Sequence, residues 1–256
     1  MTSDLVSIIT PTYNCAKFIE ETIRSVQSQT HQNWEMIISD DCSTDNTREV
    51  IAPYLESDPR IKYICNEKNS GAAITRNNAL RIAKGRWIAF LDSDDLWLPE
   101  KLERQIAFME KNNYSFSYHE YTEISEDGVD LGIHVSGRKK VSIFGMYACC
   151  WPGCLTVMYD QTKIGVIQIN NIRKNNDTAM WLKVIKKSNC YLLEESLAKY
   201  RRRKGSITPP GIKDRVIWHY RLFREAEEMS KVSAFIWMTI NIIGNSYKKA
   251  FYISRK

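Results

Sequence analysis

Apolar and polar positions alternate along the first 110 residues in two distinct rhythms. Short apolar runs predict buried strands over residues 5–10, 34–39, 60–65 and 87–91. The segments between them carry apolar residues on one side only, and they predict helices over residues 16–29, 44–55 and 70–83. Strands that alternate with helices in this way predict an α/β fold with a mostly parallel sheet and helices on both faces.

Beyond residue 113 the pattern changes to shorter strands. We expect them over residues 115–123, 155–159 and 191–200, with one helix over residues 176–187. The chain has 256 residues, which is enough for one large α/β domain or for a domain with an appendage. Hydrophobic residues make up 43% of it, so we expect a sizeable core and no wholesale disorder.

Each of the four predicted parallel strands is followed by a polar segment. These segments read TPTYN at 10–14, DDCSTD at 40–45, NEKNSG at 66–71 and DSDD at 92–95. The carboxyl ends of parallel strands lie side by side, so these groups should line one crevice. A tyrosine ring, amides, carboxylates and Arg76, one turn into the third helix, suit a nucleotide diphosphate. Taken singly, the same residues would serve as helix caps and turn residues.

Three carboxylates, Asp92, Asp94 and Asp95, follow the fourth predicted strand. Like charges in one small volume raise one another's pKa, so such a group favours a bound cation. Oxygen ligands of this kind suit Mg2+ or Mn2+, usually completed by a substrate phosphate. A solvated acidic turn that caps the next helix is the alternative interpretation.

Several classes of protein lack support in this sequence. No G-x-G-x-x-G follows the first strand and no G-x-x-x-x-G-K-[ST] occurs, which argues against dinucleotide binding and P-loop chemistry. The seven cysteines include no C-x-x-C pair, so we expect free thiols in a reducing cytosol rather than a zinc site. No basic and then apolar leader precedes Pro11, and the apolar run at 234–243 is too short to span a bilayer. We therefore expect a cytoplasmic protein.

Basic residues gather in the last part of the chain. Residues 199–256 hold 14 Lys and Arg against 4 Asp and Glu, whereas the formal net charge of the whole chain is only +6. Residues 233–256 combine Trp237 and other apolar side chains with flanking lysines, and such a helix suits the surface of an anionic membrane. An ordinary amphipathic helix that closes the domain core would give the same pattern. We expect no nucleic acid partner.

Four successive motifs resemble the signatures of the family 2 glycosyltransferases. They are PTYN at 11–14, DDCSTDNT at 40–47, NSGAAITRN at 69–77 and FLDSDD at 90–95. The resemblance is dense over residues 5–110 and thinner at 176–177 and 200–206. It implies the GT-A fold, a Rossmann-like nucleotide-binding sheet flanked by helices, over residues 1–210. Residues 1–110 would bind the nucleotide sugar, residues 111–210 the acceptor, and residues 211–256 would form a basic, amphipathic helical extension.

The resemblance also implies roles for single residues around the donor. Asp41 would accept the imide N–H of uracil, which favours a UDP-sugar. Asp92 and Asp94 would form a D-x-D pair that holds Mn2+ or Mg2+, with Asp94 as the direct ligand and Asp95 close by. The other donor-binding residues implied are Pro11, Tyr13, Asn14, Asn69, Arg76 and Ser93.

Two later segments resemble the family more loosely. The run NDTAMWL at 176–182 places Asp177 at the position of the family's general base, where Asn176 replaces the usual glutamate. The helix dipole alone would also favour an acidic residue in a first turn. In YRRRKGS at 200–206, Arg203 stands where many members have histidine, and arginine pairs with phosphate but cannot ligate a metal. We expect Arg201 or Arg203 to clamp the donor diphosphate, although a solvated basic loop would look the same.

Together these features predict an inverting, metal-dependent glycosyltransferase. It would move glucose, galactose or an N-acetylhexosamine from a UDP-sugar to a glycan hydroxyl and form a β-linked product. The acceptor would be a glycan, either free or linked to a lipid diphosphate at the inner face of the cell membrane. The resemblance to the family alone implies the pathway, which would be the assembly of a bacterial surface polysaccharide. A sugar nucleotidyltransferase would need a Gly-rich loop in place of PTYN, and a processive synthase would need a Q-x-x-R-W run and transmembrane helices. A non-catalytic protein that binds nucleotide sugars is the other alternative.

Overall fold

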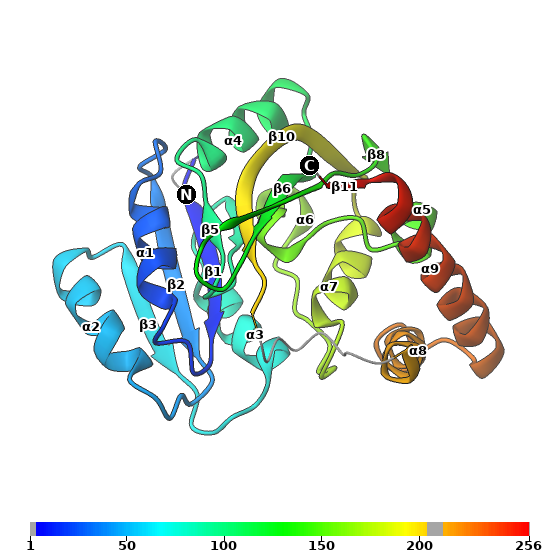
Figure 1. Cartoon of the computed structure of the whole chain (residues 1–256), viewed down its shortest axis with the longest axis horizontal. Helices are drawn as coiled ribbons and strands as arrows, with labels where there is room; N and C mark the ends of the chain where they lie inside the picture. The colour runs from blue at the N-terminus through cyan, green and yellow to red at the C-terminus, as the bar shows by residue number, and fades with distance from the viewer. Residues whose placement is uncertain (1–3, 204–211, 256) are drawn as a thin grey trace.

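The computed structural model describes residues 4–203 and 212–255, and these residues form one mixed sheet with helices on both faces (Figure 1). The strands follow one another across the sheet in the order β11-β7-β6-β9-β4-β1-β2-β3. β10 lies off this path and pairs with β5, β6 and β8. The predicted α/β class is confirmed, and β1 to β4 are parallel to one another.

The first half of the chain builds the parallel part of the sheet. Its strands are β1 (Val6–Thr12), β2 (Trp34–Asp40), β3 (Ile61–Cys65) and β4 (Trp87–Phe90). The helices between them are α1 (Ile19–Gln27), α2 (Thr47–Ser57) and α3 (Ala72–Ile82). The chain passes from β1 outward to β2 and β3, and then returns so that β4 lies on the other side of β1. Open α/β sheets bind ligands beyond the carboxyl ends of their strands at such a reversal.

Alternate residues of these strands face two separate cores. Ile8 and Met36 pack in the core that contains the apolar side of α1, whereas Ile9 and Ile37 pack in the core that contains α3 and α7. A period of two with burial on both sides is what a central strand of a parallel sheet requires. Because a shift by one residue would exchange the two faces, this burial fixes the register and holds the carboxyl ends at one edge.

The second half of the chain extends the sheet with strands of both directions. β9 (Met158–Asp160) lies antiparallel between β4 and β6 (Phe116–Ile124), and β7 (Asp130–Val135) pairs with β6 on its other side. β10 (Cys190–Arg201) runs parallel to β6 and arches over the top of Figure 1. The remaining elements are β5 (Leu96–Trp97), α4 (Lys101–Lys111), β8 (Lys140–Val141), α5 (Ile143–Ala148), η1 (Cys154–Thr156), α6 (Gln161–Ile164) and α7 (Asn176–Ile185).

One predicted strand in this half differs from the structure, and one strand of six residues was missed. The strand expected over 155–159 is wrong in its first part, because Cys154–Thr156 forms a 3-10 turn and the strand begins only at Met158. β7 was not predicted, because most of its residues are exposed or only half-buried and its apolar pattern is weak.

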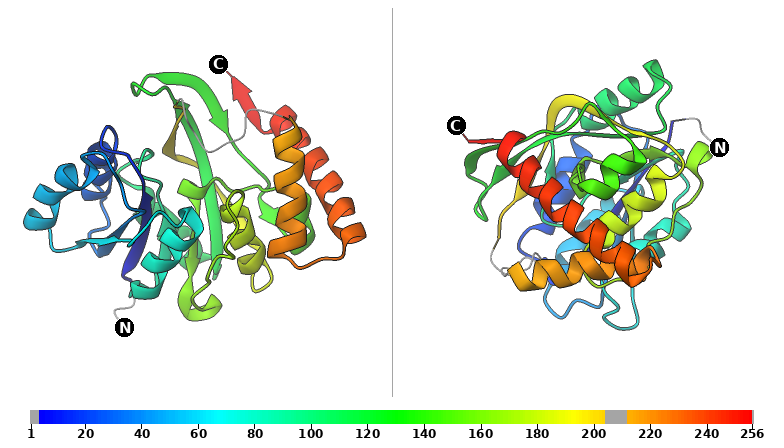
Figure 2. Two further views of the ribbon diagram at one scale, coloured as in Figure 1. Left: turned by 90° about the horizontal axis from the view of Figure 1, so that it is seen from below. Right: turned by 90° about the vertical axis from the view of Figure 1, so that its right-hand side faces the viewer.

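Residues beyond 211 pack onto the domain at the end of the molecule farthest from α2 (Figure 1, Figure 2). They form α8 (Ile212–Arg221), η2 (Leu222–Ala226), α9 (Lys231–Phe251) and β11 (Ile253–Arg255). α9 packs against α5 and α8, and β11 pairs antiparallel with β7. Within the described ranges, no helix is both long enough and apolar enough to cross a bilayer. A division of the chain near residue 210 stays a prediction.

Candidate active site

Hydrogen bonds between the loops after β1 and β2 position the first predicted nucleotide-binding residues. Asn14 adopts a left-handed backbone conformation (φ +48°), and its Oδ1 accepts from the Thr44 N–H at 2.7 Å. The Asn14 N–H in turn donates to Ser43 Oγ at 2.9 Å. Pro11 is half-buried in β1, while Tyr13 is 46% exposed. The Tyr13 ring is therefore accessible at the strand edge, where a nucleobase can stack on it.

Asp41, directly after β2, holds the segment that precedes α3. Its Oδ1 accepts from the Ser70 N–H at 2.7 Å and from Asn66 Nδ2 at 2.8 Å. Its Oδ2 accepts from the Gly71 N–H at 2.8 Å. Asp41 is buried, whereas Asn69 in the same segment is exposed. Since a carboxylate oxygen has two lone pairs, Oδ2 keeps acceptor capacity for an N–H group of a base.

Arg76 in α3 joins the end of β4 to the start of α7. Its Nη2 lies 2.5 Å from Asp92 Oδ1, and its Nη1 donates to Asn176 Oδ1, also at 2.5 Å. Burial works to lower the pKa of Arg76, but nearby negative charge, including that of Asp92 and Asp177, outweighs it and holds the pKa above its ordinary value. The bridge thus brings the predicted donor site and the helix that bears Asp177 together.

The carboxylates after β4 are close enough to disfavour one another's charge. Burial, helped by the charge of Asp92, raises the pKa of Asp94, although Arg203 opposes this rise. Arg203 Nε lies 2.5 Å from Asp94 Oδ2. Burial raises the pKa of Asp95 well above its usual range, and the charges of Asp94 and Asp92 add to the effect. Ser93 is buried between the carboxylates. A cluster of this kind gains from added positive charge.

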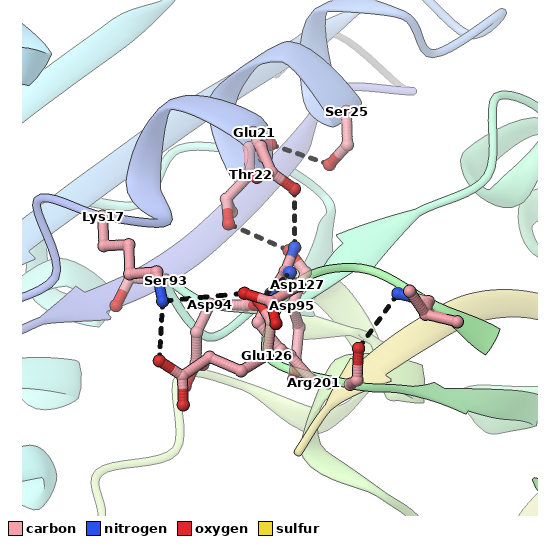
Figure 3. A network of polar contacts seen from close by, with 12 residues as sticks. Lys17, Glu21, Thr22, Ser25, Ser93, Asp94, Asp95, Glu126, Asp127 and Arg201 are labelled. Atoms are coloured by element: carbon pink, nitrogen blue, oxygen red, sulfur yellow. Dashed lines mark hydrogen bonds and ion pairs between the residues drawn. The ribbon is translucent and has the colours of Figure 1, made fainter. Parts of the chain in front are cut away.

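Asp95 and Arg201 are committed to contacts within the protein (Figure 3). Asp95 Oδ1 accepts from the Arg201 N–H at 2.8 Å. The Arg201 side chain is buried, and its guanidinium contacts the carbonyl oxygens of Asp94 and Glu126 at 2.9 Å and Glu21 Oε2 at 2.6 Å. Arg201 therefore fixes the loop at 92–95. Of the two arginines expected to clamp a diphosphate, Arg203 is the one whose guanidinium pairs with a carboxylate of the predicted site, that of Asp94.

Over residues 4–203 and 212–255, no three His, Cys, Asp or Glu side chains gather in an arrangement that could hold a metal ion. Asp92, Asp94 and Asp95 influence one another's charge but do not form a three-carboxylate metal site, and Asp95 Oδ1 accepts from the backbone N–H of Arg201. Asp92 and Asp94 have the donor chemistry that suits a divalent cation, although in this structure each is paired with an arginine, and their metal role stays a prediction. They offer hard oxygen donors at the strand edge, where a substrate diphosphate would complete the coordination.

Asp177 lies half-buried in the first turn of α7, and its Oδ1 accepts from the Thr178 N–H at 2.7 Å. Its charge acts on the ionisation of groups from three other helices, namely Arg76 in α3, His219 in α8 and Lys248 in α9. Asp177 is thus within electrostatic reach of α3, α8 and α9. A carboxylate in such a place can take a proton from a hydroxyl group.

Three residues that sequence reasoning did not assign line the same space. Asn176 accepts the hydrogen bond from Arg76 Nη1. Cys154 Sγ lies 3.9 Å from Asp92 Oδ1, and burial raises the pKa of the Cys154 thiol well above its usual range. Cys150 Sγ accepts from Thr178 Oγ1 at 3.3 Å. No local signal marks these cysteines, because they come from a loop that is remote in sequence from the carboxylates it meets.

The family model and the similar proteins of known name all point to the glycosyltransferases. Residues 7–147 match the family model described as Glycosyl transferase family 2. The chain is 41% identical over 247 residues to TuaG of Bacillus subtilis (strain 168), named as a glycosyltransferase of teichuronic acid biosynthesis, and the match covers 96% of this chain and 97% of TuaG. It is 41% identical over 212 residues to WfgD of Escherichia coli, a UDP-Glc:alpha-D-GlcNAc-diphosphoundecaprenol beta-1,3-glucosyltransferase, covering 82% of each chain.

Solved structures with the same fold share much less sequence. The structure of S. aureus TarS 1-349 with UDP-GlcNAc has a TM-score of 0.71 at 20% identity and covers 97% of this chain and 73% of TarS 1-349. The mannosyltransferase PcManGT of Pyrobaculum calidifontis, with GDP-Man and Mn2+, has a TM-score of 0.62 at 16% identity, covering 96% and 75% of the two chains. These similarities confirm the expected GT-A fold.

Proposed function

The chain belongs to glycosyl transferase family 2, and we propose that it transfers a hexose from a UDP-sugar to a glycan hydroxyl with inversion at the anomeric carbon. The observation that carries this proposal is the Arg76 bridge, which ties Asp92 to the helix that bears Asp177. Direct displacement needs a leaving diphosphate and a base on opposite sides of one carbon atom. Holding both in one crevice supplies much of that alignment.

The donor would lie across the carboxyl ends of β1, β2 and β4. Tyr13 would stack on the uracil ring, and Asp41 Oδ2 would accept its imide N–H, which cytosine lacks. Arg203 would move from Asp94 to the diphosphate, because a bidentate arginine–phosphate pair is favourable. The other residues proposed to contact the donor are Pro11, Asn14, Asn69, Arg76, Asp92 and Ser93.

The reaction would then proceed in one displacement. Asp177 would accept the proton of the acceptor hydroxyl as its oxygen bonds to the anomeric carbon, while the bond from that carbon to the diphosphate breaks and UDP leaves. Arg76, oriented by Asp92 and Asn176, would stabilise the negative charge of the leaving group. Asp92 and Asp94 would hold Mn2+ or Mg2+, which when bound supplies further charge stabilisation for the diphosphate. An α-linked donor would give a β-linked product.

For the acceptor we propose a glycan on a lipid diphosphate, and for the pathway the assembly of a bacterial surface polysaccharide. WfgD has such an acceptor and a β-1,3-glucosyl product in its name, and TuaG is named for teichuronic acid biosynthesis. The identity of 41% to WfgD makes glucose the first sugar to test, before galactose and N-acetylhexosamines. The enzyme would work in the cytoplasm, at the inner face of the cell membrane.

A lipid-linked acceptor gives α9 a role at that surface. The side of α9 that faces the protein buries Ala234, Met238 and Asn241. Its opposite side exposes Val232, Phe235, Ile236 and Ile243, hereafter the outer apolar face of α9. α9 carries three lysines and no acidic residue. Exposed apolar side chains flanked by lysines suit an anionic bilayer, so we propose that residues 233–256 contact the membrane through this face.

The experiment that tests the proposed function measures UDP release from a panel of UDP-sugars, with and without a synthetic GlcNAc-diphosphate lipid. We expect acceptor-dependent release, highest with UDP-glucose. UDP should compete with the donor far better than CDP, and Asp41→Ala should narrow that difference. Binding of UDP without turnover of any UDP-sugar would favour the non-catalytic alternative. Equal inhibition by UDP and CDP would contradict the role of Asp41.

A further inference from the structure

The side of α9 that faces the protein carries a polar stripe made of Asn241, Gly244, Asn245 and Lys248. Residues three and four apart share one side of a helix, so these four lie in a row. Polar side chains that face an interior are costly unless they find partners. Every partner described below belongs to residues 147–151, which are the last two residues of α5 and the three residues that follow it.

The first half of the stripe fixes the end of α5. Asn241 is buried, and its Nδ2 donates to the carbonyl oxygen of Tyr147 at 2.8 Å. Gly244 lies so close to α5 that a Cβ atom there would fall 2.0 Å from the carbonyl oxygen of Ala148. The two helices therefore touch at their backbones, and no larger residue than glycine fits at this position.

The second half of the stripe holds the backbone that follows α5. Lys248 Nζ donates to the carbonyl oxygen of Cys150 at 3.2 Å and to that of Trp151 at 2.6 Å. Burial lowers the pKa of Lys248, while the charge of Asp177 acts in the opposite direction. The ammonium group thus satisfies two carbonyl groups that belong to no helix or strand, on the side of the crevice where Asp177 lies.

Cys150 connects this lysine to the start of α7. Its Sγ accepts from Thr178 Oγ1 at 3.3 Å, and the Thr178 N–H donates to Asp177 Oδ1 at 2.7 Å. Burial, with the charge of Asp177 adding to its effect and that of Lys248 opposing it, raises the pKa of the Cys150 thiol to about 12. Two residues, Cys150 and Thr178, therefore separate Lys248 from the proposed base.

We infer that Lys248 is a positioning residue of the active site. By holding the backbone at 150–151 against α9, it fixes Cys150 and, through Thr178, the orientation of Asp177. The inference rests on the proposed function for the role of Asp177, whereas the positioning itself is a property of the ligand-free protein. Methionine at 248 would fill similar space but leave two carbonyl groups without their donor.

Three variants test this inference in detergent micelles, with UDP-glucose and the GlcNAc-diphosphate lipid as substrates. Lys248→Met should lower kcat by about 10-fold or more, because a misplaced base loses alignment, and should leave KM for UDP-glucose unchanged. Lys248→Arg, which keeps the donors, should recover most of kcat. Lys249→Met removes the same charge from the exposed neighbouring lysine and should behave as wild type. Equal effects of Lys248→Met and Lys249→Met would overturn the inference.

A double-mutant cycle shows whether Lys248 acts through Thr178. Thr178→Val removes the hydroxyl that meets Cys150 and keeps the shape of the side chain. If the chain of contacts is correct, Lys248→Met should cost much less in kcat on the Thr178→Val background than on the wild type. Fully additive effects would mean that Lys248 does not act through this contact.

Hydrogen exchange on the ligand-free protein gives a readout that needs no turnover. Lys248→Met should speed exchange in residues 149–154 and in the first turn of α7, but not in β1 to β4. Unchanged exchange at 149–154 would refute the positioning role even if kcat falls. If the wild type turns over no UDP-sugar, the proposed function fails, while this measurement still decides the inference.

Discussion

At the scale of single residues, the site depends on two arginine–carboxylate pairs of different burial. Arg76 is buried and Asp92 is mostly so, with 8% and 30% of their side chains exposed. Removing one partner of a fully buried pair costs about 3–5 kcal/mol, and somewhat less here because Asp92 reaches solvent. In the second pair, 26% of the Arg203 side chain and 17% of the Asp94 side chain are exposed. Arg203 is thus more exposed than Arg76, and its charge can reach solvent when its partner is removed. Asp94 is therefore the better position at which to test the chemistry without loss of the fold.

Substitution of Asp94 should separate metal dependence from folding. Asp94→Asn should lower transfer by roughly 10²-fold, the scale for losing one electrostatic contact in a reaction centre, and leave the melting temperature near that of wild type. EDTA should abolish activity of the wild type, and Mn2+ should restore it there but not in the variant. Transfer assays with both proteins check this, and full wild-type activity in EDTA would exclude a metal from the mechanism.

Substitution of Asp177 should remove the base and keep the helix. Asparagine retains the size and the acceptor of the side chain but not its basicity. We expect turnover to fall by ~10²-fold or more, with UDP affinity unchanged. Steady-state kinetics and calorimetric UDP titration measure the two quantities. A variant with nearly normal turnover would place the base on another residue.

At the scale of helices and strands, the parallel half of the sheet follows from sequence periodicity because its strands are buried on both faces. The antiparallel half was harder to predict, since β7 is mostly exposed and η1 interrupts an apolar run. Most of the motif residues could be named in advance because they lie next to the end of a strand, whereas Arg76 lies one turn into α3 and Asp177 in the first turn of α7. The bridge from Arg76 to Asn176 and the contact of Cys150 with Thr178 could not, because they join segments that meet only after folding.

The sequence of α9 also left open which of its sides is buried, because apolar residues surround the helix. In the structure the buried side includes Asn241 and Lys248, and the exposed side is the outer apolar face. An exposed apolar surface of this kind often marks a site of contact with a membrane or with another protein. The sequence analysis treated a membrane-surface helix and a helix that closes the core as alternatives. In the structure one side of α9 packs on the domain and the other side is exposed, so the two roles do not exclude each other.

Substitution of the outer apolar face should abolish membrane binding without affecting stability. Phe235→Ser with Ile243→Ser should lose co-sedimentation with anionic vesicles, because both side chains are more than 60% exposed. High salt should release the wild type only in part. It screens the electrostatic attraction, which is about 1 kcal/mol for each lysine near the surface, but it does not weaken the contact of the apolar side chains with the bilayer. The double variant should melt like wild type and still bind UDP. If the wild type ignores vesicles but dimerises through Phe235, a second copy covers this face.

At the scale of the whole molecule, the segment after residue 230 packs on the second half of the domain. α9 packs on α5 and β11 pairs with β7, so deletion of residues 233–256 uncovers a core face and a strand edge. We expect the truncated protein to melt several degrees lower than the wild type and to aggregate, unlike the double variant of the outer face. Differential scanning calorimetry and light scattering test this. A truncated protein with wild-type stability would mean that α9 is only an anchor.

The place of β11 beside β7 also bears on how the chain folds during synthesis. At roughly 5–20 residues per second, β1 to β4 with α1 to α3 leave the ribosome well before α9 and β11. Much of the parallel half can pack early, because β1 to β4 pair with one another, although β4 also pairs with β9, which is synthesised later. β7 then waits with one side unpaired until β11 arrives, and an unpaired strand edge is a template for association with other chains. A ribosome that stalls before α9 therefore releases a chain with a packed parallel sheet and an unpaired strand edge at β7, and we expect chaperones and proteases to act on such a chain.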